Sequence, residues 1–440
     1  MKNSYLLKHC LWVMAACMAA CGTQKKLNSG ARHLLQQPGL AAAHTGISLM
    51  DVETGKYLYN YQGDKYFIPA SNTKLLTCYA AMKYLGDSLA GLDVIETADS
   101  IQLVATGDPT LLHPDFVHHP VYDFLKRAAK PLIADSTPWT ENAYGTGWAW
   151  DDFSDDYMAE RSSLPIYGNV VTVSGTGKTV VAVPRMFDVQ PVASLGVSYG
   201  FVNKVSRAFH RNSFRYMATG KTNAFHALPF ITSDSLGMQL LADTLHKRIA
   251  LRGNIAVADD SAAVKRYTVY SQRTDSMLRR MMHRSDNFYA EQSLLMVGRT
   301  RLQQLRTRAI IDTLLATDYN EMPQRPRWVD GSGLSRYNLL SPQDFVWLLA
   351  KMKADFSWQR ITGILQTGGE GTLSNYYKQF AGRIYAKTGT LSNNVALSGY
   401  LITDKGRTLA FSVIVNNHQA SVTAIRREVE AFLGGVIKAY

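Results

Sequence analysis

Three short polar motifs in this 440-residue chain combine residue types that can carry out acyl transfer. In order they are a Ser-x-x-Lys sequence at Ser71–Lys74, a Ser-Asp-Asn sequence at Ser285–Asn287 and a Lys-Thr-Gly sequence at Lys387–Gly389. A serine hydroxyl attacks an amide carbonyl efficiently only when a base removes its proton. A lysine can be that base if burial or a second ammonium lowers its pKa. The motifs therefore indicate a nucleophilic serine with a lysine base, the second lysine supplying the extra charge.

The residues after the first motif predict a helix. Apolar residues recur at helical spacing from Leu75 to Tyr84. Ser71 would then lie at a helix N-terminus, where free N–H groups and the helix dipole stabilise developing negative charge. Positions i and i+3 share a helix face, so Lys74 would lie one turn from the hydroxyl. A helix-capping serine with a solvated lysine is the alternative for this motif taken alone.

The other two motifs fall in different local settings. Ser285–Asn287 reads as a short loop between two helices, or, taken alone, as an ordinary helix start. Lys387–Gly389 lies in a β-type stretch, where Gly389 indicates either a close backbone approach by a ligand or a strand edge. The ordered set of three motifs favours the catalytic interpretation.

Longer segments extend this pattern. The three motifs together are the signature of penicillin-binding proteins and class A β-lactamases. From about Gly46 to the C-terminus, the chain resembles the D-alanyl-D-alanine carboxypeptidase/endopeptidase branch of the class C low-molecular-mass penicillin-binding proteins. The segments that resemble this branch are Gly107–Leu111, Tyr167–Val171, Asp330–Arg336 and Gly371–Leu373. The run from Asp330 to Arg336 favours this branch because β-lactamases in general are not expected to carry it.

The chemistry and the resemblance assign catalytic roles to four residues. Neutral Lys74 is expected to take the Ser71 proton, and Ser285 to pass a proton to the leaving amine. Asn287 is expected to orient Lys74 and to hydrogen-bond the substrate amide. Water then hydrolyses the acyl-enzyme, and no metal or organic cofactor is implied.

The resemblance also implies the binding residues. Lys387 and the hydroxyls of Thr388 and Thr390 are expected to hold the terminal carboxylate of D-alanyl-D-alanine, with Gly389 between them. The backbone N–H groups of Ser71 and Thr390 are expected to form the oxyanion hole. The implied partners are peptidoglycan stem peptides, as substrates, and β-lactam antibiotics, which acylate Ser71.

Motif spacing predicts the domain organisation. Ser71 and Ser285 lie 214 positions apart, whereas Ser285 and Lys387 are separated by 102. The family places a large, mostly β-rich insertion in the first gap, and 170–183 shows a hairpin pattern. We expect a discontinuous catalytic domain at 27–95 and 269–440, with an inserted domain at 96–268. Strand patterns at both ends of the catalytic part predict an α+β fold, an antiparallel sheet flanked by helices, like that of DD-peptidases and β-lactamases.

The N-terminus, 1–21, is expected to be an export signal. Lys2 and Lys8 precede the apolar stretch Cys10–Ala20, which is too short for a membrane span. The segment Met18–Gly22 resembles a lipoprotein processing site, although Met18 replaces the usual leucine. Lipidation of Cys21, or simple cleavage, would follow. The expected location is periplasmic, with a lipid anchor to the cell envelope.

Net charge, histidine spacing and the cysteines bear on which partners and which kinds of site the protein can have. The net charge is +12 and falls to +10 without Lys2 and Lys8. An exported basic protein is expected to meet an anionic envelope rather than nucleic acid, although the charge can also serve solubility alone. The eleven histidines show no metal-ligand spacing, and His113, His118 and His119 are expected to be solvated in a loop. Lipidation at Cys21 would leave Cys78 as the only free thiol, expected to be buried.

Two alternative functions stay open. A β-lactamase differs from a penicillin-binding peptidase in how fast it deacylates, and a factor of ten in rate is only about 1.4 kcal/mol. A catalytically idle wall-binding scaffold is the second alternative. Loss of Ser71, Lys74 or Lys387 would be its signature, and all three are present.

Overall fold

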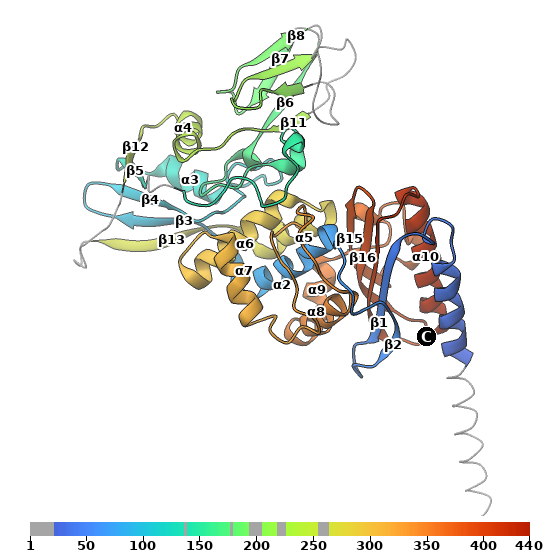
Figure 1. The fold of residues 1–440 in the computed structure, drawn as a ribbon. Coiled ribbons are helices and arrows are strands. Elements are labelled where there is room, and N and C mark those ends of the chain that lie inside the picture. Colours follow the sequence, from blue (N-terminus) through green and yellow to red (C-terminus); the bar gives the residue numbers. More distant parts are fainter. Residues whose placement is uncertain (1–21, 136–138, 177–178, 193–204, 218–225, 254–263) are drawn as a thin grey trace, which may run out of the picture.

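The computed structural model describes residues 22–135, 139–176, 179–192, 205–217, 226–253 and 264–440. Figure 1 shows a body of helices and one sheet, formed by both ends of the chain, with the middle of the chain projecting from it. The expected signal segment 1–21, including Cys21, lies outside the described residues. None of the helices in the described ranges combines the length and apolar character needed to cross a membrane.

A six-stranded antiparallel sheet is the framework of the body. Its strand order is β14-β15-β16-β17-β1-β2, and every neighbouring pair is antiparallel. The strands are β1 (His44–Asp51), β2 (Tyr57–Tyr61), β14 (Gln366–Thr367), β15 (Ile384–Leu391), β16 (Asn394–Ile402) and β17 (Thr408–Asn416). Residues at the two ends of the chain therefore form one sheet, which confirms the predicted α+β fold.

Helices cover both faces of this sheet (Figure 1). On one face, α10 (Val422–Ala439) and the helical residues 22–35 pack in a common apolar cluster with the strands. On the other face lies a larger cluster built from six helices. These are α2 (Lys74–Tyr84), α5 (Thr274–Arg284), α6 (Asn287–Leu302), α7 (Thr307–Ala316), α8 (Pro342–Asp355) and α9 (Trp358–Ile364). Cys78 is fully buried in this second cluster, as expected for a small apolar side chain.

The described residues of the inserted part contain three smaller sheets and two α-helices. A five-stranded sheet has the order β12-β5-β4-β3-β13, and two three-stranded sheets have the orders β11-β6-β7 and β8-β10-β9. The hairpin expected at 170–183 is formed by β6 and β7. The elements are β3 (Ser88–Glu96), β4 (Ile101–Ala105), α3 (Pro120–Arg127), β5 (Leu132–Asp135), β6 (Val170–Thr176), β7 (Thr179–Val183), β8 (Val189–Val192), β9 (Val205–Arg207), β10 (Phe214–Met217), β11 (His226–Pro229), α4 (Asp234–Leu245), β12 (Ile249–Arg252) and β13 (Lys265–Arg273).

Strand pairing bears on the limits of the insertion. Boundaries at 95/96 and 268/269 pass through β3 and β13, which pair with each other in the five-stranded sheet. A strand and its partner share a hydrogen-bonded ladder, so they belong to one folding unit. We therefore propose that the insertion starts just before β3 and ends just after β13. The sequence pattern gave little indication of these limits, because β13 alternates weakly and is largely exposed.

Candidate active site

Ser71 lies on a single helical turn that leads into α2. The 3₁₀ turn η1 spans Ala70–Thr73, and α2 begins at Lys74. The Lys74 Nζ lies 3.0 Å from the Ser71 Oγ. Ser71 is half-buried, whereas Lys74 is fully buried. The expected proximity of serine and lysine across one turn is present, with a 3₁₀ turn in place of the first α-turn.

Two further acceptors surround the Lys74 amine. Its Nζ is 2.6 Å from the Asn287 Oδ1 and 2.7 Å from the backbone oxygen of Ser332. The Asn287 amide donates through its Nδ2 to the Tyr157 carbonyl at 3.1 Å, which fixes its oxygen toward Lys74. A neutral amine has two N–H donors and one lone pair. With both N–H groups donated to these acceptors, the lone pair faces the Ser71 hydroxyl.

Burial makes the neutral form of Lys74 accessible. Loss of water around the ammonium lowers the pKa of Lys74 to about 8, although the carboxylates of Asp330, Asp286 and Glu291 act in the opposite direction. We expected burial and the charge of Lys387 together to lower the pKa of Lys74, and burial is the main cause of the lowering. The result is a lysine that is partly neutral near pH 7.

The second motif is a short connection between α5 and α6, as predicted. Ser285 ends α5 in the left-handed conformation, with φ 61°. Asp286 caps α6 by accepting a hydrogen bond from the backbone N–H of Tyr289 at 3.0 Å. Asn287 is then the first residue of α6, directed at Lys74. The connection therefore brings Ser285 and Asn287 to the same end of α6.

Lys387 connects the third motif to the second. It lies on β15, is fully buried, and donates to the Ser285 Oγ at 2.8 Å and to the Thr388 carbonyl at 2.7 Å. Burial first, then the nearby Lys74 and Arg426 charges, hold the pKa of Lys387 well below its usual range. Because Lys387 donates to the Ser285 oxygen, the proton of Ser285 is free to be given to another group.

Gly389 has a structural reason to be glycine. A Cβ at this position would lie 2.7 Å from the carbonyl oxygen of Pro69 and 3.2 Å from the Cβ of Ala70. A side chain would therefore push β15 away from the turn that carries Ser71. The close backbone approach predicted from the glycine is present, but the approaching group is the serine turn of the protein itself. Substrate contact by Gly389 stays a prediction.

The run Asp330–Arg336 carries the Ser332 carbonyl that Lys74 contacts. Asp330 is fully buried and accepts four hydrogen bonds, two at each oxygen. The donors are the backbone N–H of Gly333 and the Nδ2 of Asn338 at Oδ1, and the backbone N–H of Ser335 and the Nε1 of Trp148 at Oδ2. This hub fixes the loop that presents the Ser332 carbonyl to Lys74. The sequence marked the run as a family segment but did not indicate its role.

Two hydroxyls of β15 have partners that the sequence did not predict. The Thr388 Oγ1 lies 2.6 Å from the Oγ1 of Thr372, which in turn accepts from the Nε2 of Gln366 at 2.5 Å. The Thr390 Oγ1 accepts from the Arg426 Nη2 at 2.7 Å. Thr372 lies in the recurrent segment Gly371–Leu373, whereas Arg426 lies on α10, outside every recognised motif.

A cavity of about 350 Å³ lies beside the second motif, where the insertion meets α6. Its walls include Asp115, Tyr157, Ser285 and Asn287. His113 is a further wall residue, and it is buried against the Tyr289 hydroxyl at 3.0 Å. The expectation that His113 is solvated is therefore wrong, because its loop packs onto α6 rather than projecting into water.

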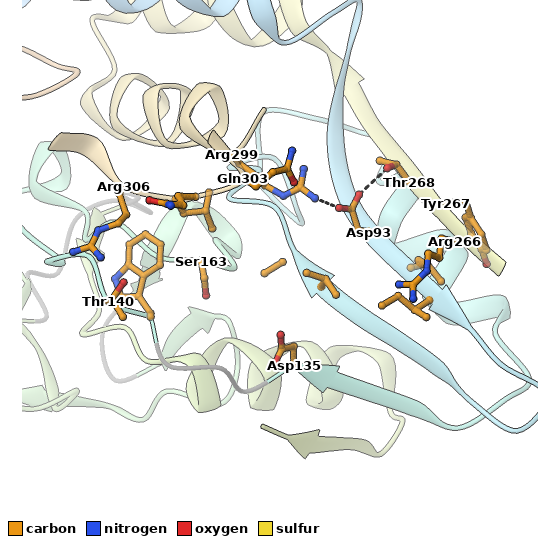
Figure 2. Close-up of a pocket in the computed structure, with 17 residues that line it drawn as sticks. Asp93, Asp135, Thr140, Ser163, Arg266, Tyr267, Thr268, Arg299, Gln303 and Arg306 are labelled. Carbon is orange, nitrogen blue, oxygen red and sulfur yellow. Dashed lines mark hydrogen bonds and ion pairs between the residues drawn. The ribbon is translucent and has the colours of Figure 1, made fainter. Parts of the chain in front are cut away.

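A larger cavity, of about 830 Å³, lies away from the motifs, between the five-stranded sheet and the loop after α6 (Figure 2). Two of its charged residues are paired with each other, since Arg299 forms an ion pair with Asp93, which also accepts from the Thr268 Oγ1 at 2.7 Å. None of the motif residues lines it. Size alone therefore does not identify the reactive site here.

The chain is similar to known D-alanyl-D-alanine carboxypeptidases over most of its length. A D-alanyl-D-alanine carboxypeptidase from Actinomadura sp. (strain R39) is 27% identical over 437 residues, covering 88% of this chain and 80% of the relative. The D-alanyl-D-alanine carboxypeptidase DacB of Haemophilus influenzae is 22% identical, covering 86% of each. The crystal structure of penicillin binding protein 4 from Haemophilus influenzae superposes with a TM-score of 0.72 at 18% identity, covering 92% of this chain and 99% of that one.

The family assignment follows from a match over nearly the whole chain. Residues 27–434 match the D-Ala-D-Ala carboxypeptidase 3 (S13) family. This match includes the three motifs and the whole insertion, and it confirms the resemblance expected from the sequence. The chain belongs to the D-Ala-D-Ala carboxypeptidase 3 (S13) family of serine peptidases.

Proposed function

We propose that this chain hydrolyses peptide bonds on the carboxyl side of D-alanine in peptidoglycan stem peptides, through an acyl-enzyme at Ser71. At free ends this is the D-alanyl-D-alanine bond, and in cross-links it is the bond between D-alanine and an amine of the second stem. One observation carries the proposal. The buried Lys74 amine has two fixed acceptors, Asn287 Oδ1 and the Ser332 carbonyl, so its neutral form directs a lone pair at the Ser71 hydroxyl 3.0 Å away. This is the arrangement that a serine needs for deprotonation near neutral pH.

Acylation then follows in balanced steps. Lys74 takes the Ser71 proton as the Oγ attacks the carbonyl carbon of the penultimate D-alanine. The backbone N–H groups of Ser71 and Thr390 would stabilise the oxyanion, worth about 10²–10³ in rate per donor. The C–N bond breaks as Ser285 gives its proton to the leaving amine. Lys387, which donates to the Ser285 Oγ, would return a proton to Ser285 and be replenished with the proton that Lys74 took from Ser71. Water then hydrolyses the Ser71 ester in the second half of the cycle.

The free edge of β15 supplies a binding surface for the peptide. In the described residues, β14 pairs with β15 only at Tyr385 and Ala386, so no strand covers the same edge from Lys387 to Leu391. An extended peptide can add to such an edge as a further strand through main-chain hydrogen bonds. Its terminal carboxylate would then lie near Lys387, Thr388 and Thr390.

A direct test uses an acylated tripeptide ending in D-alanyl-D-alanine, with release of D-alanine as the readout. We expect the purified chain to release one D-alanine per peptide and to leave the L-alanyl-L-alanine analogue intact. Turnover of neither peptide would reject the proposal. A disaccharide-linked, cross-linked dimer of stem peptides tests the endopeptidase activity in the same assay.

The pH dependence of this reaction follows from the lowered pKa of Lys74, about 8. The protonated amine has no lone pair, so activity requires the deprotonated form. We therefore expect kcat/KM to rise roughly tenfold per pH unit up to about pH 8 and then to level off. Steady-state rates from pH 5.5 to 9.5 measure this rise in kcat/KM. A rate that is independent of pH between 6 and 8 would contradict a lysine base with this pKa.

Reaction with penicillins follows from the same serine. Penicillin binding protein 4 from Haemophilus influenzae has been solved in complex with a β-lactam. We propose that a β-lactam acylates Ser71 here as well, because opening the lactam amide requires the same nucleophile, base and oxyanion hole. The proton goes to the lactam nitrogen, which stays attached, so no leaving group departs.

The substrate also suggests where the protein works. Peptidoglycan lies outside the cytoplasmic membrane, so we propose export to the cell envelope, with Cys21 as a lipid anchor. Intact mass of the membrane-fraction protein tests the anchor. A diacylglycerol-modified N-terminal Cys21 supports it, and an unmodified N-terminus at any position rejects it.

A further inference from the structure

We propose that Arg426, on the C-terminal helix α10, is a positioning residue that makes the enzyme require a free carboxylate at the end of its substrate. The inference rests on the proposed function, and it adds a residue outside the three motifs to the site. Arg426 would act through the Thr390 hydroxyl and through its positive charge beside β15.

The first step is the direction of one hydrogen bond. The Arg426 Nη2 donates to the Thr390 Oγ1 at 2.7 Å. A hydroxyl has one proton to give, and its oxygen is already accepting from the guanidinium. The Thr390 proton is therefore available for an acceptor on the open side of β15. A substrate carboxylate is the acceptor that best matches a hydroxyl polarised by a cation.

The Thr388 hydroxyl can also be left with a proton to donate. Gln366 donates to the Thr372 Oγ1, so the Thr372 proton can be given to the Thr388 Oγ1 at 2.6 Å once a substrate accepts from Thr388. The Thr388 proton is then also free. Two adjacent hydroxyls on alternate positions of one strand, both with protons to donate, fit the two oxygens of one carboxylate.

The charge of Arg426 is not neutralised within the protein. It forms no ion pair with any carboxylate of the described residues, and its guanidinium lies 5.5 Å from the centre of the Tyr376 ring. The next residue, Arg427, contacts the same ring at 4.6 Å but pairs with the Glu430 carboxylate at 2.6 Å. Of these neighbouring arginines, only Arg426 contacts Thr390 and keeps an uncompensated charge.

Lys387 is poorly suited to supply this charge alone. It is fully buried and already donates to Ser285 and to the Thr388 carbonyl. Its pKa is well below the usual range for lysine, because of burial and of the Lys74 and Arg426 charges. A guanidinium keeps its charge at any pH at which proteins fold. Arg426 therefore provides the permanent positive charge near the carboxylate position.

The test compares two substrates that differ only at the terminus. One is an acylated tripeptide ending in D-alanyl-D-alanine with a free carboxylate, and the other is its C-terminal carboxamide. We expect Arg426→Gln to lower kcat/KM for the carboxylate substrate about 10- to 100-fold, mainly through KM, since a charge-assisted hydrogen bond is worth that much. The carboxamide substrate should change less than about twofold, and Arg426→Lys should restore part of the lost activity.

Arg427→Gln is the matched control, because it removes a neighbouring cation from the same aromatic ring without touching Thr390. It should leave both substrates unchanged. An equal loss on both substrates in Arg426→Gln would show a merely structural role and overturn the inference. An unchanged KM for the carboxylate substrate would also overturn it, while the wild type would still demonstrate the proposed function. If the wild type cleaves neither peptide, the proposed function fails and the inference falls with it.

Discussion

Replacement of Lys74 by arginine is expected to lower kcat/KM for D-alanine release by about 10²–10⁴, the usual contribution of a general base. Arginine keeps the positive charge and the long side chain. It cannot lose a proton at accessible pH, so it cannot accept the one from Ser71. Lys74→Met should lose a similar factor, because it removes both the charge and the base. Initial rates at pH 8 measure both variants.

The control for this prediction lies on the same helix. Lys83 forms an ion pair with Asp318 at 2.5 Å, and its side chain is 41% exposed. Lys83→Met should therefore retain wild-type rates. Thermal unfolding of all three variants shows whether they are folded. Near-wild-type turnover by Lys74→Arg would mean that Lys74 acts only as a charge, and another base would then have to be sought.

Replacement of Asp330 by asparagine should destabilise the protein strongly, although the two side chains have nearly the same shape. Each oxygen of Asp330 accepts two hydrogen bonds. Asparagine replaces one oxygen by an NH₂ group, which cannot accept, so two buried donors would lose their acceptor. Each buried donor that is left without an acceptor costs about 1–3 kcal/mol, so the loss should be about 2–6 kcal/mol. Urea-induced unfolding measures the difference in free energy.

Asp312→Asn is the comparison for this variant. Asp312 is on α7 and half-exposed, and it pairs with Arg308 one turn away. Its replacement should change the free energy of unfolding by no more than about 0.5 kcal/mol. Equal stability of Asp330→Asn and Asp312→Asn would show that the hydrogen-bond hub does not hold the loop behind Lys74.

The local setting of each motif could be predicted from the sequence because it depends on neighbouring residues. The apolar spacing after Ser71 indicated α2, and the apolar runs on both sides of Ser285 indicated two helices with a corner between them. The strand that carries Lys387 could also be predicted from its β-type sequence. Ordered motifs then made it reasonable to place Ser71, Lys74, Ser285, Asn287 and Lys387 in one site.

The rest of the site depends on contacts between distant segments. Arg426 lies 36 positions from Thr390, and Ser332 lies 258 from Lys74. A backbone carbonyl such as that of Ser332 has no signature in the sequence, since every residue has one. Gly389 could be recognised as a close approach, but its partner, the Pro69 carbonyl, comes from another element. The same limit applies to the pairing of β3 with β13, which spans the whole insertion and is the reason for the limits that we propose.

Covalent labelling of Ser71 tests the central claim most directly. Purified mature protein would be mixed with benzylpenicillin and followed by intact mass over hours, with Ser71→Ala as the control and peptide mapping to locate the adduct. The account predicts one long-lived adduct of a single drug molecule on Ser71 and none on Ser71→Ala. An adduct that persists in Ser71→Ala, or an unmodified wild type without hydrolysed drug, would contradict the account. Rapid drug hydrolysis without a lasting adduct would identify a β-lactamase instead.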